Sequence, residues 1–194
     1  MSFDCLFLGG AMDRSNHYEA AFEGFLQWHK LCYIAIDETR RSSLGGEPVK
    51  SLDFIVHGDC GSRLLVDVKG RRFPGGSKEK PNLSWQCWTK QIDVSDMLRW
   101  QDQFGEDFLS LFVFIYLLDA DTGLPMVPGD LWTWRGNRYY FRSVLVADYQ
   151  LAMKQRSPKW ETVDLPTAVF RQLAKPFYYF TSQIVPQMDE NVPF

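Results

Sequence analysis

Apolar and polar residues along Ser51–Arg72 alternate in a way that predicts two β-strands joined by a turn. Apolar side chains take every second position of the first strand, Ser51–His57, and fill most of the second strand, Arg63–Lys69. Because successive side chains of a strand point to opposite faces, this alternation is typical of a strand with one buried face. The turn between them contains Gly58 and Gly61, and glycine permits positive φ angles there.

A helix is predicted over Asn16–Lys30, where apolar side chains recur at helical spacing. Asn16 can cap this helix, and Glu19, three residues later, completes a pattern that resembles a capping box. Glu19 and Glu23 are four residues apart and therefore lie on one face of the helix. The strand Leu31–Ile36 follows directly, so this helix, this strand and the hairpin give the order αβββ.

The second half of the chain is predicted to complete a mixed sheet. Ser95 is expected to cap a second helix, Asp96–Phe104, and the apolar segment Phe108–Leu118 is expected to be a central strand covered on both faces. A hairpin and two short helices follow, over Leu131–Trp134, Arg138–Val144, Asp148–Lys154 and Pro166–Ala174. The predicted fold class is α/β. It has a central mixed four- to five-stranded sheet flanked by helices in the order αβββαβ, then a C-terminal β-hairpin and helices, all in one domain of residues 1–194.

Charged side chains interrupt the apolar pattern at one end of the first hairpin. Asp67 and Lys69 are two residues apart, so they share a face of their strand while Val68 points away. A neighbouring strand can bring Asp53 to the same end. Burying two carboxylates and a lysine is costly without a purpose, and oxygen ligands beside a cation are what a Mg²⁺ site for phosphate chemistry needs. The same residues also suit an edge strand with exposed charges.

Asp53, followed after 13 residues by Asp67-x-Lys69, resembles the motif of the PD-(D/E)xK nuclease superfamily, whose core is restriction-endonuclease-like. Leu52 stands where the motif has proline, at a position that varies in the superfamily. The resemblance implies that Asp53, Asp67 and the carbonyl of Val68 bind Mg²⁺ or Mn²⁺. It also implies that Lys69 polarises the attacking water and stabilises the charge that develops on the phosphate.

The resemblance also assigns a role to the first helix. In many members of the superfamily a glutamate of this helix, often after an aromatic residue, reaches the metal site. Glu19 follows Tyr18 and matches that position better than Glu23, which is the second choice. Glu19 is therefore a predicted catalytic residue and metal ligand, and helix capping is the alternative explanation for a glutamate at this position.

The segment His17–Glu23, HYEAAFE, resembles the signature of the uncharacterised, mainly planctomycete HYExAFE family. The same resemblance extends to Leu65–Arg72, Arg99–Gly105 and Ser157–Trp160. It therefore covers most of the chain and implies membership and fold, but no activity.

Charge is unevenly distributed along the chain. The net charge is −3, but Arg40–Lys90 holds ten Lys or Arg and five Asp or Glu, a net charge of +5, which leaves −8 for the rest. A basic region around an acidic metal site favours a phosphodiester substrate, although ordinary solvated charge gives the same count. The candidate substrate contacts are Arg71, Arg72, Gln101, Arg40 and Arg41.

Composition narrows the class of protein. The 45% hydrophobic and 23% charged content is typical of a soluble globular protein, and no apolar run reaches the length of a membrane span. The four cysteines are far apart and form no zinc pattern with the three histidines. Reduced thiols and the lack of a signal-peptide pattern predict a cytoplasmic protein.

The predicted function is a Mg²⁺-dependent deoxyribonuclease, with DNA favoured over RNA on family grounds and a homodimer left open. One alternative is a catalytically silent nuclease-fold domain that binds nucleic acid or protein. Another is an interaction protein whose aromatic-rich C-terminal half is the working surface. Because clustered carboxylates repel one another, the sequence also predicts that Asp67→Ala raises the melting temperature of the metal-free protein.

Overall fold

The computed structural model describes residues 16–37, 42–59, 61–76, 80–120 and 129–182. Its centre is a six-stranded mixed sheet with the strand order β1-β4-β5-β9-β11-β10. These strands are β1 (Cys32–Ala35), β4 (Phe54–His57), β5 (Arg63–Phe73), β9 (Phe108–Leu118), β11 (Asn137–Leu145) and β10 (Asp130–Trp134). Only the central pair of this sheet, β5 and β9, is parallel, while the other neighbours are antiparallel.

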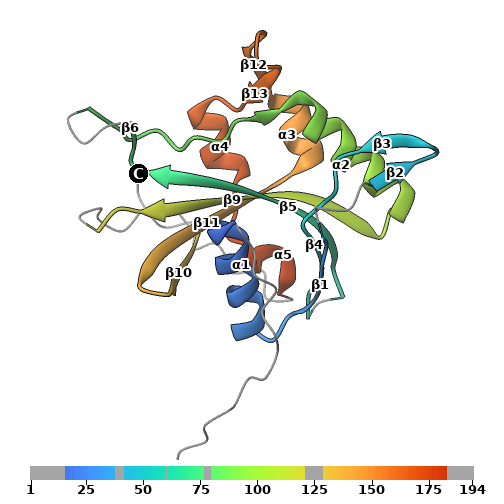
Figure 1. The fold of residues 1–194 in the computed structure, drawn as a ribbon, viewed down its shortest axis with the longest axis horizontal. Coiled ribbons are helices and arrows are strands. Elements are labelled where there is room, and N and C mark those ends of the chain that lie inside the picture. Colours follow the sequence, from blue (N-terminus) through green and yellow to red (C-terminus); the bar gives the residue numbers. More distant parts are fainter. Residues whose placement is uncertain (1–15, 38–41, 60, 77–79, 121–128, 183–194) are drawn as a thin grey trace, which may run out of the picture.

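Helices cover both faces of this sheet (Figure 1). On one face lie α2 (Gln91–Phe104), α3 (Val146–Ala152) and α4 (Thr167–Leu173), and on the other lie α1 (His17–Trp28) and α5 (Tyr178–Thr181). Among the described residues, seven short strands form smaller sheets outside the central one, in the orders β12-β13-β8, β2-β3 and β6-β7. They are β2 (Ser42–Leu44), β3 (Glu47–Val49), β6 (Gly75–Gly76), β7 (Pro81–Asn82), β8 (Thr89–Lys90), β12 (Lys154–Ser157) and β13 (Thr162–Asp164). None of the described helices is long and apolar enough to cross a membrane.

The structure confirms the predicted α/β class and its order, because α1, β1, β4, β5, α2 and β9 follow one another as αβββαβ. The sheet has six strands, since the predicted C-terminal hairpin β10–β11 pairs with β9 and extends the sheet. The segment before β4 also contains an unpredicted hairpin, β2–β3, which turns through Gly45 and Gly46 at positive φ.

The prediction for the start of α2 was wrong by several residues. Ser95 lies inside the helix and its hydroxyl donates to the carbonyl of Ile92, so it is not the cap. The helix begins at Gln91, whose amide donates to the carbonyl of Glu161 at 2.8 Å. Because that carbonyl comes from a distant part of the chain, local capping signals could not locate this end of the helix.

Side chains of β5 alternate between two hydrophobic clusters. Leu65 and Phe73 pack in the cluster on the α2 side, whereas Leu64, Val66 and Val68 pack in the cluster on the α1 side. The α1 helix lies directly on β5, because a β-carbon added at Gly70 would lie 2.2 Å from a ring carbon of Tyr18. The odd-numbered residues between Leu65 and Phe73, Asp67 and Lys69 among them, therefore face α2.

Asp130 ties the start of α5 to the sheet. Its carboxylate is buried on β10 and accepts a hydrogen bond from the amide of Phe177 at 2.5 Å. Burial raises the pKa of Asp130 from 3.8 to about 6, and the backbone hydrogen bonds from Phe177 and Tyr178 only partly offset this effect. The folded state therefore holds the proton of this carboxyl more tightly than the unfolded chain does.

We accordingly expect Asp130 to make the protein less stable as pH rises. Its contribution is fully present below pH 3.8 and is lost as pH rises through about 6, a change of about 3 kcal/mol at most. Urea unfolding of wild type and Asp130→Asn between pH 4 and 7 measures it, since the asparagine variant cannot titrate. An unfolding free-energy difference between the two proteins that stays constant over this range would contradict the prediction.

Candidate active site

The side chains of Asp67 and Lys69 contact each other on the α2 face of β5. Lys69 Nζ lies 2.7 Å from Asp67 Oδ2, and both side chains are buried. Lys69 Nζ also lies 5.4 Å from the centre of the Phe112 ring, on the neighbouring strand β9. The two-residue spacing on a strand accounts for this contact, as the sequence predicted.

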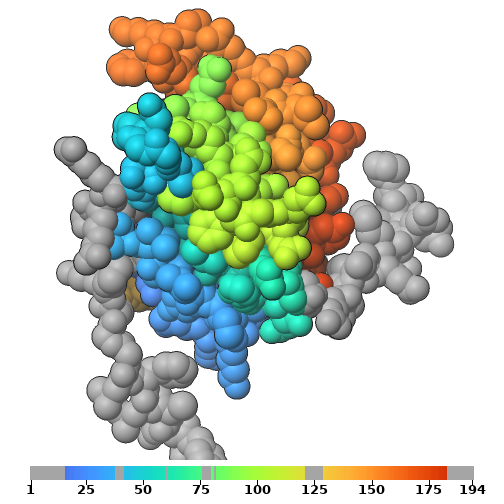
Figure 2. Space-filling model, turned by 90° about the vertical axis from the view of Figure 1, so that its right-hand side faces the viewer, coloured from blue at the N-terminus to red at the C-terminus, as the bar shows by residue number. Residues whose placement is uncertain are grey.

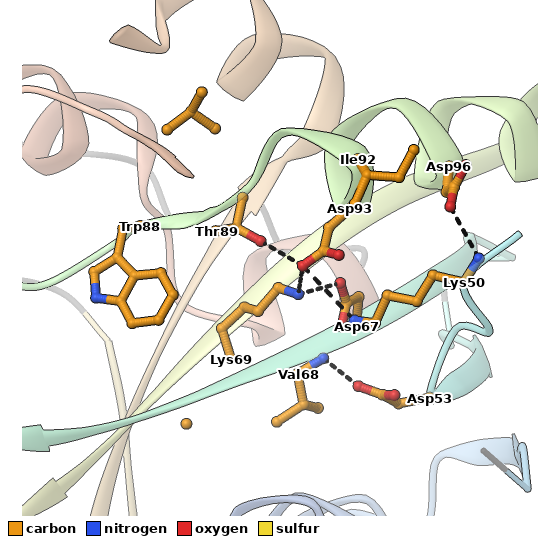
Figure 3. Close-up of polar contacts among 12 residues, drawn as sticks. Lys50, Asp53, Asp67, Val68, Lys69, Trp88, Thr89, Ile92, Asp93 and Asp96 are labelled. Carbon is orange, nitrogen blue, oxygen red and sulfur yellow. Dashed lines mark hydrogen bonds and ion pairs between the residues drawn. The ribbon is translucent and has the colours of Figure 1, made fainter. Parts of the chain in front are cut away.

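Asp53 reaches the same segment of β5 through a backbone hydrogen bond. It lies immediately before β4, and its amide donates to the carbonyl of Val66 at 2.9 Å. Its Oδ2 accepts the amide of Val68 at 2.5 Å, so the Asp53 carboxylate binds β5 where pairing with β4 ends. This bond places Asp53 beside the residue that separates Asp67 from Lys69 (Figure 3).

Asp93 is a further member of the site that the sequence analysis missed. Its Oδ2 accepts hydrogen bonds from Lys69 Nζ at 2.6 Å and from Thr89 Oγ1 at 2.8 Å. Burial alone would raise the pKa of Asp93, but attraction to Lys69 and Lys50 and the two hydrogen bonds outweigh it and lower the pKa. Because α2 was predicted to begin at Asp96, Asp93 fell outside the predicted helix. An acid in the first helical turn, four residues after a threonine, was the available signal.

Lys50 completes the group from the segment that follows β3. Lys50 Nζ lies 2.9 Å from Asp67 Oδ1 and 3.9 Å from Asp93 Oδ2. Burial alone would lower the pKa of Lys50, but attraction to Asp67, Asp93 and Asp53 and the hydrogen bond to Asp67 outweigh it and raise the pKa. Two carboxylates, Asp67 and Asp93, thus alternate with two ammonium groups, Lys50 and Lys69 (Figure 3).

A cavity of about 570 Å³ adjoins this group. Four basic residues contribute to its wall, namely Lys50, Lys69, Arg71 and Lys90. Its other lining residues are Pro48, Val49, Trp88, Thr89, Ile92, Asp93 and Asp96. Because four of the lining residues are basic, the cavity presents several positive charges next to the carboxylates of the site.

In the space-filling view the β2–β3 hairpin lies beside α2 on the surface (Figure 2).

The two predicted arginine contacts on β5 lie on opposite faces. Arg71 lines the cavity, stacks on the Trp88 ring with 4.0 Å between guanidinium carbon and ring centre, and donates to the carbonyls of Gly70 and Trp88. Arg72 is exposed and pairs with Asp119 at 2.9 Å. Strand alternation places Arg72 away from the cavity, so Arg71 is the one of the pair at the site.

The structure does not bring Gln101 or Glu23 to this cavity. Gln101 accepts the amide of Ser110 at 2.8 Å and so ties the C-terminal end of α2 to β9. Glu23 accepts a hydrogen bond from the Tyr33 hydroxyl at 3.0 Å. The predicted contacts Arg40 and Arg41 lie outside the described residues.

Glu19 remains at the start of α1, as the capping pattern predicted. Its carboxylate accepts a hydrogen bond from the side chain of Asn16, whose own oxygen accepts the Tyr18 amide at 3.1 Å. Among the described residues Glu19 does not join Asp53 and Asp67 in a metal-binding group. The physical reason is that α1 packs on the face of β5 opposite to Asp67.

The side-chain donors of the predicted metal site are carboxylate oxygens. Within the described part of the chain, no three or more His, Cys, Asp or Glu side chains gather closely enough to hold a metal ion. Asp53 and Asp67 nevertheless offer carboxylates from adjacent segments. Mg²⁺ is commonly bound by one or two carboxylates together with water and substrate phosphate, and Mn²⁺ also prefers such oxygen ligands. The donors therefore fit either ion, while an Asp67 oxygen is bound by the Lys50 ammonium.

Comparisons with solved structures find chains of similar shape, one of which is named below. No family model matches the chain, and no curated protein matches it. Membership of the HYExAFE family therefore stays a prediction. The chain is similar to the 1.6 Å structure of Hjc, a Holliday junction resolvase from the hyperthermophilic archaeon Archaeoglobus fulgidus. The TM-score is 0.43 and the identity 11%, over 81% of this chain and 92% of that chain. A likeness of this degree does not identify a function for the chain.

Proposed function

We propose that the chain is a divalent-metal-dependent phosphodiesterase of the nuclease type that acts on DNA. One arrangement carries this proposal. Asp67 and Lys69 are in contact on one face of β5, and Asp53 accepts the amide of Val68 between them. The adjacent cavity has four basic residues in its wall. The resemblance of Asp53 and Asp67-x-Lys69 to the PD-(D/E)xK motif supports the same function, and DNA as the substrate rests on that resemblance.

The proposed site divides its tasks between carboxylates and lysine. Asp53, Asp67 and the carbonyl of Val68 would hold Mg²⁺ or Mn²⁺, and a bound ion lowers the pKa of a coordinated water and offsets negative charge on the phosphate. Lys69 holds its ammonium group at the cavity wall, where it can donate to the attacking water or to a phosphate oxygen. Asp93 acts as a positioning residue, because it binds Lys69 Nζ at 2.6 Å.

The cavity suits a phosphodiester for two physical reasons. Its volume of about 570 Å³ falls within the range of small-molecule sites and can accept a nucleotide unit. Its basic residues also outnumber its acidic ones, which favours an anionic ligand.

Asp53→Asn is the sharpest test of this function. An asparagine oxygen can still accept the Val68 amide, so the junction between β4 and β5 is retained while the charge is removed. We expect wild type to cut at least one of a panel of linear, nicked, branched and single-stranded DNAs with Mg²⁺ or Mn²⁺, and Asp53→Asn to lose this cleavage. The matched control is Asp119→Asn, at the exposed pair with Arg72, which should cut like wild type.

A silent nuclease-fold domain is the second candidate, and one observation favours it. Both oxygens of Asp67 already contact lysine ammonium groups, which partly neutralises the carboxylate that a metal would use. Equal cleavage by wild type and Asp53→Asn would point to a contaminating enzyme. DNA binding without cleavage in either metal would establish the silent domain instead.

A further inference from the structure

The backbone of Lys50 is fixed against α2. Its amide donates to Asp96 Oδ2 at 2.9 Å, and its carbonyl accepts the indole N–H of Trp100 at 2.8 Å. Asp96 is buried, so both backbone groups of Lys50 are held by the helix that also carries Asp93. The Lys50 side chain therefore starts from a fixed point and extends across the site.

The Lys50 ammonium occupies the position of a counter-ion. It lies 2.9 Å from Asp67 Oδ1, and it also attracts Asp93 and Asp53. These are the two carboxylates assigned above to the metal, together with the residue that positions Lys69. The Lys50 ammonium would strongly repel a divalent ion held by Asp53 and Asp67, because both carry positive charge at short distance.

We propose that Lys50 is the resident counter-ion of the Asp53–Asp67 pair and competes with divalent metal for it. This inference rests on the proposed function, because it concerns the same carboxylates. The Lys50 ammonium would move out into the adjacent cavity and leave the two carboxylates free to hold a divalent ion. Lys50 thereby sets the metal concentration at which the site is filled.

The surroundings of the two lysines show why Lys50 is the one that moves. The Lys50 side chain is 37% exposed and lines the cavity, whereas the Lys69 side chain is only 9% exposed. Lys69 also contacts both Asp67 and Asp93 within 2.7 Å. Displacing Lys50 needs only rotation of its side chain, because its backbone contacts with Asp96 and Trp100 can stay intact.

Calorimetric titration of Mn²⁺ into the full chain without DNA tests the inference. Lys50→Met should bind Mn²⁺ at least about tenfold more tightly than wild type, because the competing ammonium group is gone. Lys90→Met is the matched control. It removes the same charge from the wall of the same cavity, but Lys90 is exposed and forms none of the ion pairs described above. We expect it to change the affinity by no more than about twofold.

Two further readouts separate competition from a general structural effect. In an Asp67→Asn background, Lys50→Met should no longer change the Mn²⁺ affinity, because Asp67 carries the contact with Lys50. Mn²⁺ should also raise the melting temperature of Lys50→Met more than that of wild type.

The outcomes distinguish this inference from the proposed function. Binding to Lys50→Met alone, with none to wild type, supports the inference. Equal affinity of wild type and Lys50→Met overturns the competition and leaves the metal-dependent function standing. If neither folded protein binds Mn²⁺, the metal-dependent function fails and the competition fails with it.

Discussion

A Lys69→Met variant is expected to cleave DNA about 10²–10³-fold more slowly than wild type, with little change in DNA affinity. The ammonium of Lys69 is buried between Asp67 and Asp93, so its position in the site is fixed before any substrate binds. A preorganised positive charge acts mainly on the charge that develops in the transition state. Its loss should therefore lower kcat more than it raises KM.

Single-turnover cleavage and equilibrium DNA binding, measured side by side, check this prediction. The cleavage rate and DNA affinity of Lys69→Met are compared with those of Lys90→Met. That variant also removes a lysine charge from the cavity wall, but from an exposed side chain. If Lys69→Met cuts as fast as wild type, Lys69 has no catalytic role. If Lys69→Met loses DNA binding and cleavage to the same degree, Lys69 is a substrate contact and its role in the transition state fails.

The parts of the site that the sequence predicted are those that depend on strand alternation. Asp67 and Lys69 share a face of β5 because they are two residues apart, which needs no knowledge of the rest of the fold. Asp53 could be placed because a hairpin brings the end of one strand beside the other. The central strand β9 was likewise recognised from an apolar run that only burial on both faces explains.

The parts that the sequence did not predict depend on tertiary contacts. Lys50 reaches Asp67 only because Asp96 and Trp100 of α2 hold the segment after β3, and no local pattern encodes that docking. The start of α2 is fixed by the carbonyl of Glu161, which lies 70 residues later in the chain than Gln91.

Glu19 shows a related limit of sequence analysis. Helical periodicity gives the face of α1 on which Glu19 lies, but not the side of the sheet on which α1 packs. The contact between Tyr18 and Gly70 decides the second point, and it joins residues far apart in the chain. The carboxylate that completes the charge cluster around Lys69 therefore comes from α2, at Asp93.

Asp67→Asn is expected to lower the free energy of unfolding of the metal-free protein by about 3 kcal/mol. This is opposite to the stabilisation predicted from the sequence for Asp67→Ala, which assumed a cluster of like charges. In the structure Asp67 is fully buried and contacts two ammonium groups, at 2.9 Å from Lys50 and 2.7 Å from Lys69. Removing its charge leaves both lysines to share Asp93, which is 3.9 Å from Lys50.

Urea unfolding in the presence of EDTA, followed by tryptophan fluorescence, measures this change. Asp107→Asn provides the matched control, because Asp107 forms an exposed pair with Arg63 and should change stability by less than about 1 kcal/mol. Adding Lys50→Met to Asp67→Asn should recover part of the loss, since one uncompensated ammonium group is then absent. An increase in stability for Asp67→Asn would instead mean that repulsion among Asp53, Asp67 and Asp93 exceeds their attraction to the lysines. Lys50 would then not be the counter-ion of this site.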